Sequence, residues 1–432
     1  MKKFLSFLLA LVLVFSLGSV AVASEQEYSE YAELTYEDIF FPEDLLEDEV
    51  FVAALNEQLV EKFGAAFMEN QEQALALREE LLGSFPMNRA GDVIYPDYFG
   101  GFFIDDNGNL VTMIVEEHSD YAGFAMVGAR GMSVVPAQFS YSELNAVIAH
   151  LDGLSITRPD VIFSLSDGWG LNTIGNTVEV HLIYYSPAQE ELFRTRVFDS
   201  PVISFLPAMN INSEPLEEQL DVLNYYDSAV MGIAPLNTTL RTGQLIFYGR
   251  VVGRSSLGYR ARRNGQNGFV THAHISTNGQ WLGDSMRVNS TMHINSNTGT
   301  RIGTVAASSM VAVDAAFIRL EGAFAVEPHS TTPTAVDVPV VGMQVTSFGA
   351  VSGTRHGRVT RTGVTAIVNQ HTLHQIVETD YRSQGGDSGG IVFRFGNPAN
   401  HSLHGIHIAS SANNSFYSRA DRINSQLGLT LH

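Results

Sequence analysis

Between residues 50 and 84 the apolar side chains recur every three or four positions, as at Leu55, Leu59 and Phe63. Spacings of three and four residues place side chains on one face of an α-helix. This segment is therefore expected to form one long amphipathic helix or two shorter ones.

From residue 90 to residue 206 the pattern alternates between strand and helix. GGFFIDDNGNLVTMIV, residues 100–115, predicts a β-hairpin with Asn107 and Gly108 at its turn. YSELNAVIAHL (141–151) predicts a short helix, and VEVHLIYY (178–185) and RTRVFDSPVISFL (194–206) predict strands. We expect one α+β domain, or two small ones, followed by a linker over residues 207–235.

The pattern of apolar and turn-forming residues changes after residue 236. Short runs of Val, Ile, Thr and Phe are interrupted by Gly and Asn every eight to twelve residues or so, which predicts an antiparallel β-barrel or sandwich. Only RADRINSQLG (419–428) is typical of a helix, with Gly428 as its C-cap.

The first 23 residues have the features of an export signal. Lys2 and Lys3 precede the apolar stretch FLSFLLALVLVFSLGSV, and Ala21-Val22-Ala23 matches a cleavage site with small residues. A membrane anchor is the alternative, but the apolar run is short and an acidic segment follows it. We expect a secreted, extracellular protein without stable membrane association.

Composition divides the rest of the chain in two. Residues 24–235 carry 7 Lys and Arg against 37 Asp and Glu, whereas residues 236–432 carry 16 Arg against 9 Asp and Glu. The acidic part should attract the basic part. The arginines are scattered singly rather than grouped with aromatic residues, which argues against a nucleic-acid partner.

The chain has no cysteine, so disulfides and thiolate sites are excluded. Residues 24–49 show no usable apolar period and are expected to be poorly ordered.

Three separate motifs contain the candidate chemistry. A serine hydroxyl becomes a nucleophile when a base takes its proton and a third group orients that base. Ser388 lies in SQGGDSGGIV, His274 follows an apolar strand in NGFVTHAHIS, and Asp314 is enclosed by apolar residues in SSMVAVDAAFIRL. The N–H groups of Gly386 and Ser388 are candidates for an oxyanion hole. Each residue alone has an ordinary structural explanation, but the order His, Asp, Ser favours a catalytic triad.

At these motifs the sequence resembles the chymotrypsin-like serine peptidases, in particular the bacterial branch of α-lytic protease and the streptogrisins. The similar stretches are GYRARRNGQNGFVTHAHI, VDAAFIRL, GGDSGG and SFYSRADRINSQLGLTL, and more loosely YFGGFFIDDNGNLVTMIV in the N-terminal part. The family usually has Ala-Gly-His-Cys around its histidine, where this chain has His272-Ala273-His274-Ile275. The register from Gly268 favours His274 over His272 as the catalytic residue.

The resemblance implies a fold and a domain order. Residues 236–432 would form an all-β peptidase domain of two six-stranded β-barrels with a C-terminal helix. Residues 24–235 would be an α+β propeptide that serves as intramolecular chaperone and inhibitor, after a signal peptide at 1–23. The expected product is a secreted serine endopeptidase made as a zymogen, acting on polypeptides and monomeric when mature, with no cofactor.

The stretch LHGIHIASS, residues 403–411, bears on specificity. Gly405-Ile406-His407 resembles a segment of bacterial glutamyl endopeptidases whose histidine contacts an acidic substrate side chain, so His407 implies a preference for Glu or Asp before the cut bond. Arg382 lies on the segment that would form the opposite wall. Ile408, Ala409 and Ser410 stand where the family has a serine and glycines that line the substrate.

Two other classes of function stay open. One is a catalytically silent binding or scaffold protein on the same fold. The other is a metallohydrolase, because histidines cluster as His371-x-x-His374 and His401-x-x-His404-x-x-His407. Those spacings suit a helix, whereas the surrounding pattern is strand and loop, so no metal site is expected.

Overall fold

The computed structural model describes residues 49–89, 92–115, 132–211, 239–250, 253–277, 280–311, 313–326, 335–368, 371–395 and 401–431. The expected signal peptide, nearly all of the acidic segment 24–49 and most of the expected linker lie outside these residues. Within them, no helix is long and apolar enough to cross a membrane.

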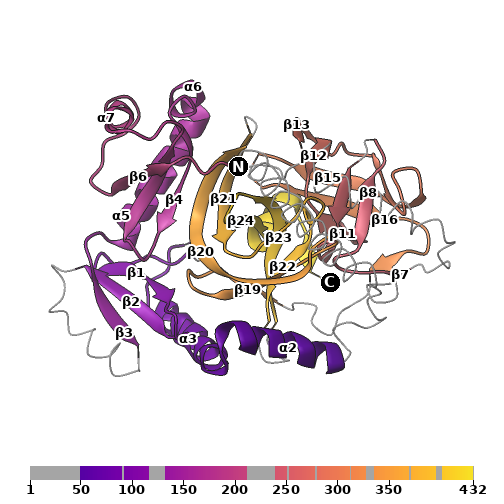
Figure 1. Cartoon of the computed structure of the whole chain (residues 1–432), viewed down its shortest axis with the longest axis horizontal. Helices are drawn as coiled ribbons and strands as arrows, with labels where there is room; N and C mark the ends of the chain where they lie inside the picture. The colour runs from indigo at the N-terminus through magenta and orange to yellow at the C-terminus, as the bar shows by residue number, and fades with distance from the viewer. Residues whose placement is uncertain are drawn as a thin grey trace, which may run out of the picture.

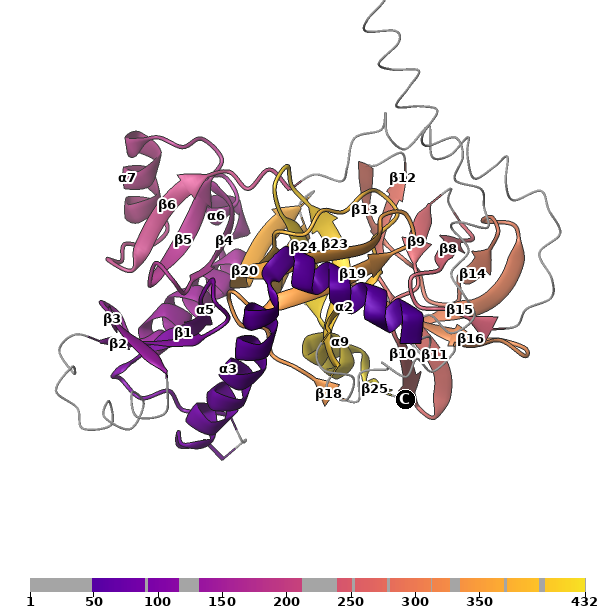
Figure 2. The same ribbon diagram turned by 60° about the horizontal axis from the view of Figure 1, so that its bottom comes forward.

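The N-terminal segment forms two helices, α2 (Glu49–Phe63) and α3 (Ala65–Gly83), which are separated at Gly64. Of the two expected alternatives, two shorter helices are therefore correct. Figure 2 shows α2 lying across the front of the barrels and α3 turning down from its end. Phe67 and Leu75 of α3 pack with Val340 and Met343 in one buried cluster. The apolar face of α3 therefore packs against the C-terminal part of the chain.

An α+β region follows the helices (Figure 1). Its elements are β1 (Phe99–Ile104), β2 (Leu110–Val115), β3 (Ser133–Ala137), α5 (Tyr141–Thr157), α6 (Pro159–Ile162), β4 (Ser166–Asn172), β5 (Thr177–Leu182), α7 (Pro187–Arg196) and β6 (Ile203–Pro207). The hairpin β1–β2 and helix α5 are confirmed. Trp169 and Phe193 are fully buried in a core whose buried members all come from this region.

The expectation of a strand over residues 194–206 is wrong in its first part. Residues 194–196 end helix α7, and only Ile203–Pro207 form a strand. Ser186 caps the helix by accepting the N–H of Gln189, and Pro187 occupies its first turn, where the missing N–H costs nothing. The capping residue and the proline therefore favour a helix up to Arg196, although the β-branched residues that follow favour a strand.

The first half of the basic region forms a β-barrel. With the short strand β25 (Thr430–Leu431) at its edge, its sheet has the order β25-β10-β11-β16-β15-β14-β8-β9. Strands β9 and β10 belong to one segment, residues 254–263, which pairs with β8 at one end and with β11 at the other. The sheet therefore closes on itself as six strands. Its members are β8 (Leu245–Tyr248), β9 (Arg254–Ser256), β10 (Arg260–Arg263), β11 (Gln266–Thr271), β14 (Thr291–Ile294), β15 (Thr300–Ser309) and β16 (Ala315–Leu320).

The second half forms another barrel of six strands. These are β19 (Gln344–Gly349), β20 (Gly353–Val368), β21 (His371–Thr379), β22 (Ile391–Arg394), β23 (Ser402–Ser410) and β24 (Ser415–Arg419). The order β19-β22-β23-β24-β21-β20 is closed by pairing of β19 with β20. The short elements outside the two barrels are β7 (Thr239–Leu240), β12 (His274–Thr277), β13 (Gln280–Ser285), β17 (Ala325–Val326), β18 (Ala335–Val336) and β25 (Thr430–Leu431).

The chain ends in helix α9 (Ala420–Leu427), and Gly428 follows it in the left-handed conformation, as expected for a C-cap. The two barrels, this helix and the preceding α+β region confirm the expected fold class.

The α+β region joins the second barrel by β-sheet pairing. Strand β20 is 16 residues long, and its far end pairs with β4, for example Thr365 with Trp169. The sheet thus continues from the second barrel through β4 and β5 to β6. Gly168 allows this approach, since a Cβ there would lie 2.6 Å from the carbonyl oxygen of Thr365.

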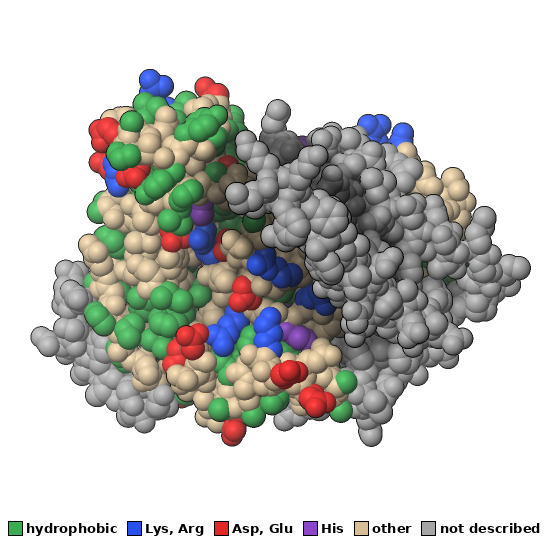
Figure 3. All heavy atoms as spheres, viewed as in Figure 1, with side chains coloured by type: hydrophobic (Ala, Val, Ile, Leu, Met, Phe, Trp, Pro, Cys, Tyr) green, Lys and Arg blue, Asp and Glu red, His purple; other side chains and the backbone are tan. Residues whose placement is uncertain are grey.

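Ion pairs also cross between the acidic and the basic parts. Arg361 pairs with Glu179 at 2.5 Å, Arg358 with Asp106 at 2.7 Å, and Arg394 with Glu72. In one further pair the arginine belongs to the acidic part: Arg78 of α3, which is 5% exposed, binds Asp337 at 2.7 Å. Figure 3 shows basic and acidic side chains side by side in the middle of this face.

Candidate active site

The antiparallel pairing of β11 with β16 brings His274 and Asp314 together. Thr271, the last residue of β11, pairs with Ala316 near the start of β16. His274 follows β11 by three residues and Asp314 directly precedes β16, so both lie at the same edge of the sheet. Residues 40 positions apart in the sequence thus become neighbours.

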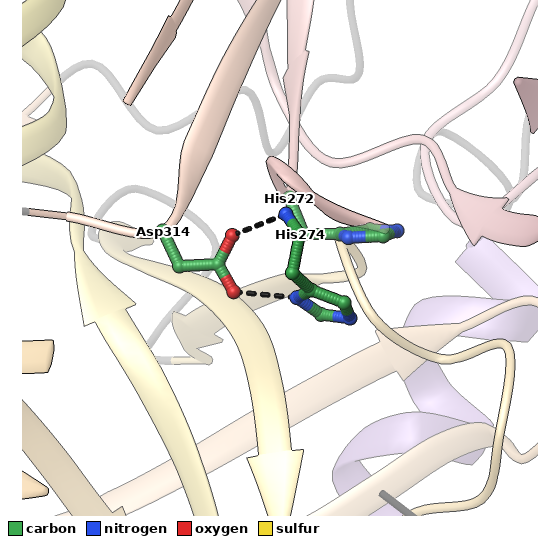
Figure 4. Close-up of side chains that lie close together, drawn as sticks. All are labelled: His272, His274 and Asp314. Atoms are coloured by element: carbon green, nitrogen blue, oxygen red, sulfur yellow. Dashed lines mark hydrogen bonds and ion pairs between the residues drawn. The ribbon is translucent and has the colours of Figure 1, made fainter. Parts of the chain in front are cut away.

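Asp314 binds the histidine segment through both carboxylate oxygens (Figure 4). Its Oδ2 lies 2.5 Å from Nδ1 of His274. Its Oδ1 accepts the backbone N–H of Ala273 at 2.7 Å and of His274 at 2.9 Å. The carboxylate therefore fixes both the backbone and the ring of His274, and an ionised Asp314 requires the Nδ1–H tautomer.

The surroundings keep Asp314 ionised although it is fully buried. Burial alone would raise the pKa of its carboxyl group. The His274 ring, the nearby His272 and the backbone N–H of Ala273 outweigh that effect and hold the pKa of Asp314 below its ordinary value. At neutral pH the pair is a carboxylate facing an imidazole N–H.

The glycine-rich loop around Ser388 is held by the side chain of Asp387. Oδ1 of Asp387 accepts the N–H groups of Val351 and Ser352, both at 2.9 Å, and Oδ2 accepts that of Gln384 at 2.9 Å. Gly386 has a φ of 106°, a conformation that favours glycine. Within the described residues, the N–H groups of Gly386 and Ser388 make no hydrogen bond, and both residues are partly exposed.

This loop packs directly against the histidine segment. A Cβ on Gly389, whose φ is 90°, would lie 2.2 Å from Oγ1 of Thr271 and 3.1 Å from the nitrogen of His272. Only glycine therefore fits beside these two residues. Among the described residues, Oγ of Ser388 forms no hydrogen bond to His274. The structure thus brings His274 and Asp314 into contact and places the loop of Ser388 beside the residues preceding His274.

His407 lies on β23 against the same loop. Its carbonyl accepts the N–H of Gly389, and its N–H donates to the carbonyl of Gly390, both at 2.8 Å. Its Nδ1 lies 3.1 Å from the hydroxyl of Tyr381. Burial lowers the pKa of His407 to about 4 and raises that of Tyr381, so both are neutral at pH 7.

The other expected substrate-binding residues are placed differently. Arg382 is exposed, and its guanidinium donates to the carbonyl of Ala412, in the turn after β23. Within the described residues it makes no hydrogen bond to His407. Ile408 is 1% exposed, in the apolar core, at a bulge of β23. Ala409 and Ser410 follow it and are also buried.

Of the histidines considered as metal ligands, His371 and His374 lie on β21, whereas His401 directly precedes β23 and His404 and His407 lie on it; β24 separates these two strands. His272, His274 and Asp314 do offer ligand atoms within 4.8 Å of one another. Tetrahedral zinc with bonds of 2.0–2.1 Å separates its ligand atoms by about 3.3 Å. The 2.5 Å between His274 and Asp314 suits a hydrogen bond and not two ligands of one ion.

Sequence reasoning missed two serines of β9. The N–H of Ser256 donates to the carbonyl of Ser388, and its hydroxyl donates to that of Gly386, both at 2.8 Å. Ser255 lies 2.6 Å from Nε2 of His272. No local motif marks these serines, because their partners are 17 to 132 positions away along the chain.

Parts of this chain are similar to known proteins. Residues 61–133 match the family model of a Pro-like N-terminal domain. No curated protein matches the chain. Among solved structures, it is similar to Protease A of Thermobifida fusca (22% identity, TM-score 0.37, 45% of this chain and 98% of that one) and to Nocardiopsis protease (23%, 0.36, 45% and 99%). It is also similar to a glutamic-acid-specific serine protease described as using a histidine triad in substrate binding (23%, 0.35, 45% and 100%). These matches are bacterial chymotrypsin-like serine proteases.

Proposed function

We propose that this chain is a secreted serine endopeptidase made as a zymogen, with Ser388 as nucleophile, His274 as general base and Asp314 as the residue that orients His274. Ser388 attacks the peptide carbonyl, and its proton passes to Nε2 of His274. Asp314 stabilises the imidazolium that forms. The proton then passes to the leaving amine, and water releases the acyl group by the same route.

The N–H groups of Gly386 and Ser388 would stabilise the oxyanion. Both are without an internal partner among the described residues, and Asp387 and Ser256 fix the loop that carries them. Donors that are positioned in advance need no reorganisation when the negative charge develops on the substrate oxygen.

The observation that carries the proposal is the buried pairing of Asp314 with His274. A fully buried carboxylate that accepts two backbone N–H groups and one imidazole N–H has no simple role in packing, because burying a charge is costly. With the proton on Nδ1, Nε2 is the ring nitrogen of His274 that would act as the base.

Substitution of the nucleophile and the base tests the proposal. Ser388→Ala and His274→Ala should each abolish peptide hydrolysis, and the double variant should be little worse because triad members act as a unit. Ser425→Ala, on the exposed side of α9, and His293→Ala, in the first barrel, are matched controls that should keep activity. Full activity in Ser388→Ala would overturn the proposal.

We further propose that residues 24–235 are a propeptide that assists folding and inhibits the enzyme. Three observations support this proposal: the match of residues 61–133 to a Pro-like domain, the pairing of β4 with β20, and the ion pairs between the acidic and the basic parts. A chain starting at residue 236 should give little active enzyme, and residues 24–235 added separately should rescue part of it, less well as salt rises. Efficient folding of residues 236–432 alone would contradict the chaperone role.

His407 supports a preference for Glu or Asp before the cut bond. The Tyr381 hydroxyl lies 3.1 Å from Nδ1. With that hydroxyl as the donor, the proton of the neutral ring would lie on Nε2. That N–H can donate to a substrate carboxylate, and the approaching negative charge would favour protonation of the ring, giving a charge-assisted bond.

Cleavage profiles on a peptide library test this preference. The wild type should cut after Glu or Asp, and His407→Ala should lose that preference while His293→Ala keeps it. A wild-type preference for Arg, Phe or Leu would contradict the assignment without affecting the proposed triad.

A further inference from the structure

A second histidine lies against the ring of His274. The ring centroids of His272 and His274 are 4.0 Å apart with an interplanar angle of 38° (Figure 4). Both side chains are buried, with 3% exposure. The ring of His272 therefore limits the positions that the ring of His274 can take.

Ser255 fixes His272 from the other side. Its hydroxyl lies 2.6 Å from Nε2 of His272, and Ser255 itself is 1% exposed. This hydrogen bond is inside the barrel, where water does not compete with it. The orientation of the His272 ring is thus determined by strand β9.

The same strand holds the nucleophile loop. Ser256, next to Ser255, donates its N–H to the carbonyl of Ser388 and its hydroxyl to the carbonyl of Gly386. Its own carbonyl accepts the hydroxyl of Thr271 at 2.9 Å, which ties β9 to the end of β11. Two consecutive residues of β9 therefore contact both sides of the candidate site.

We infer that Ser255 and His272 form a positioning unit, which sets the ring of His274 relative to Ser388 by linking both to strand β9. This inference rests on the proposed function. His272 takes no proton in the reaction, and it acts through His274. Misplacing a reacting group by about 1 Å can cost roughly 100-fold in rate, so a support of this kind has a measurable effect.

The charge state of His272 fits this role. Burial, followed by the neighbouring His274, lowers the pKa of His272 well below its ordinary value, so the ring stays neutral at pH 7. A charged His272 would repel the imidazolium that His274 becomes during the reaction. A neutral aromatic ring beside it offers an electron-rich face instead.

Three variants separate the contributions of the ring and of its hydrogen bond. His272→Ala removes both. Ser255→Ala removes only the hydroxyl. The double variant Ser255→Ala/His272→Phe restores an aromatic ring without leaving a buried hydroxyl unpaired. Ser290→Ala is the matched control, because Ser290 is also buried in the first barrel and bonds to Tyr248 at 3.0 Å.

The full chain is expressed, and peptide hydrolysis is measured per active site, as titrated with an organophosphonate. His272→Ala should lower kcat about 10- to 100-fold with KM changed less than about threefold. The double variant should fall between His272→Ala and the wild type, because it restores the ring but not the hydrogen bond that orients it, and Ser290→Ala should match the wild type. An unchanged kcat in His272→Ala, or a double variant as active as the wild type, would overturn the inference.

A second readout does not depend on activity or processing. In the Ser388→Ala full chain, the proton between His274 and Asp314 should give a far-downfield NMR signal that broadens or shifts when Ser255→Ala is added, a change that leaves both rings in place. An unmoved signal would refute the positioning role even if that variant were poorly active. If Ser388→Ala alone stays active, the assignment of Ser388 as nucleophile is wrong. That result is distinct from an unmoved NMR signal, which would refute only the positioning role of His272.

Discussion

Replacement of Asp314 by Asn tests the role of the carboxylate with a change of one atom. The aspartate accepts three N–H groups, two from the backbone on Oδ1 and one from the ring of His274 on Oδ2. An asparagine offers one acceptor oxygen and one NH₂ donor, so it cannot satisfy both sides.

The asparagine amide can take two orientations, and their free-energy costs decide which one it adopts. If its NH₂ faced the two backbone N–H groups, two buried donors would be left unpaired, at about 1–3 kcal/mol each. If its oxygen keeps those two bonds, the NH₂ faces Nδ1 of His274, which must then become an acceptor. The second arrangement costs only a change of tautomer, so it should prevail.

That change of tautomer removes the base. The proton of His274 moves to Nε2, which can no longer accept the proton of Ser388. In Ser-His-Asp enzymes this change lowers kcat about 10⁴-fold, or about 5.4 kcal/mol of barrier. We expect a loss of this order in kcat for Asp314→Asn, with KM little altered.

The assay is peptide hydrolysis per folded molecule, with a thermal melt of each protein to confirm folding. Asp421→Asn, a half-exposed partner of Arg419, is the control and should be fully active. A folded Asp314→Asn variant with less than tenfold loss in kcat would refute the tautomer argument.

Two further predictions concern the contact between the acidic and the basic parts. His181 contacts Arg361 of the second barrel, His356 contacts Gln58 of α2, and burial lowers the pKa of both histidines to about 4. A histidine with a lowered pKa stabilises the docked form above its ordinary pKa of about 6.5 and loses that contribution as the pH falls toward 4. Residues 49–211 should therefore dissociate from a chain cleaved between residues 212 and 238 at pH 4.5 but not at pH 7.5 in size-exclusion chromatography, and equal retention would contradict this. Arg78→Ala should reduce the free energy of unfolding by about 3 kcal/mol in urea titrations, the lower end for breaking a buried ion pair, because Arg394 remains 3.9 Å from Asp337; a loss below about 1 kcal/mol would contradict it.

Local patterns were enough to predict several elements. The three-and-four spacing over residues 50–84 corresponds to α2 and α3, and Asn107-Gly108 lies in the turn between β1 and β2. Gly428 ends α9 as expected. In each case the information lies within a few positions of the element, where propensity and capping decide.

Other features depend on partners far away in the chain. Strand β4 was not foreseen, because its pairing with β20 joins residues almost 200 positions apart. Helix α7 was overlooked because its one buried apolar anchor, Phe193, gives too weak a period.

At the candidate site, the motifs around His274, Asp314 and Ser388 are recognisable in the sequence. The hydrogen bonds that Ser255 and Ser256 make to these motifs are not, since nothing near the serines in the sequence encodes their partners.

Labelling with a biotinylated organophosphonate identifies the nucleophile. The mature protein is treated with the probe, and the modified residue is located by peptide mass spectrometry. We expect one adduct per molecule on Oγ of Ser388, absent in His274→Ala. An adduct on another serine, or labelling of Ser388 that is equally fast in His274→Ala, would contradict this expectation.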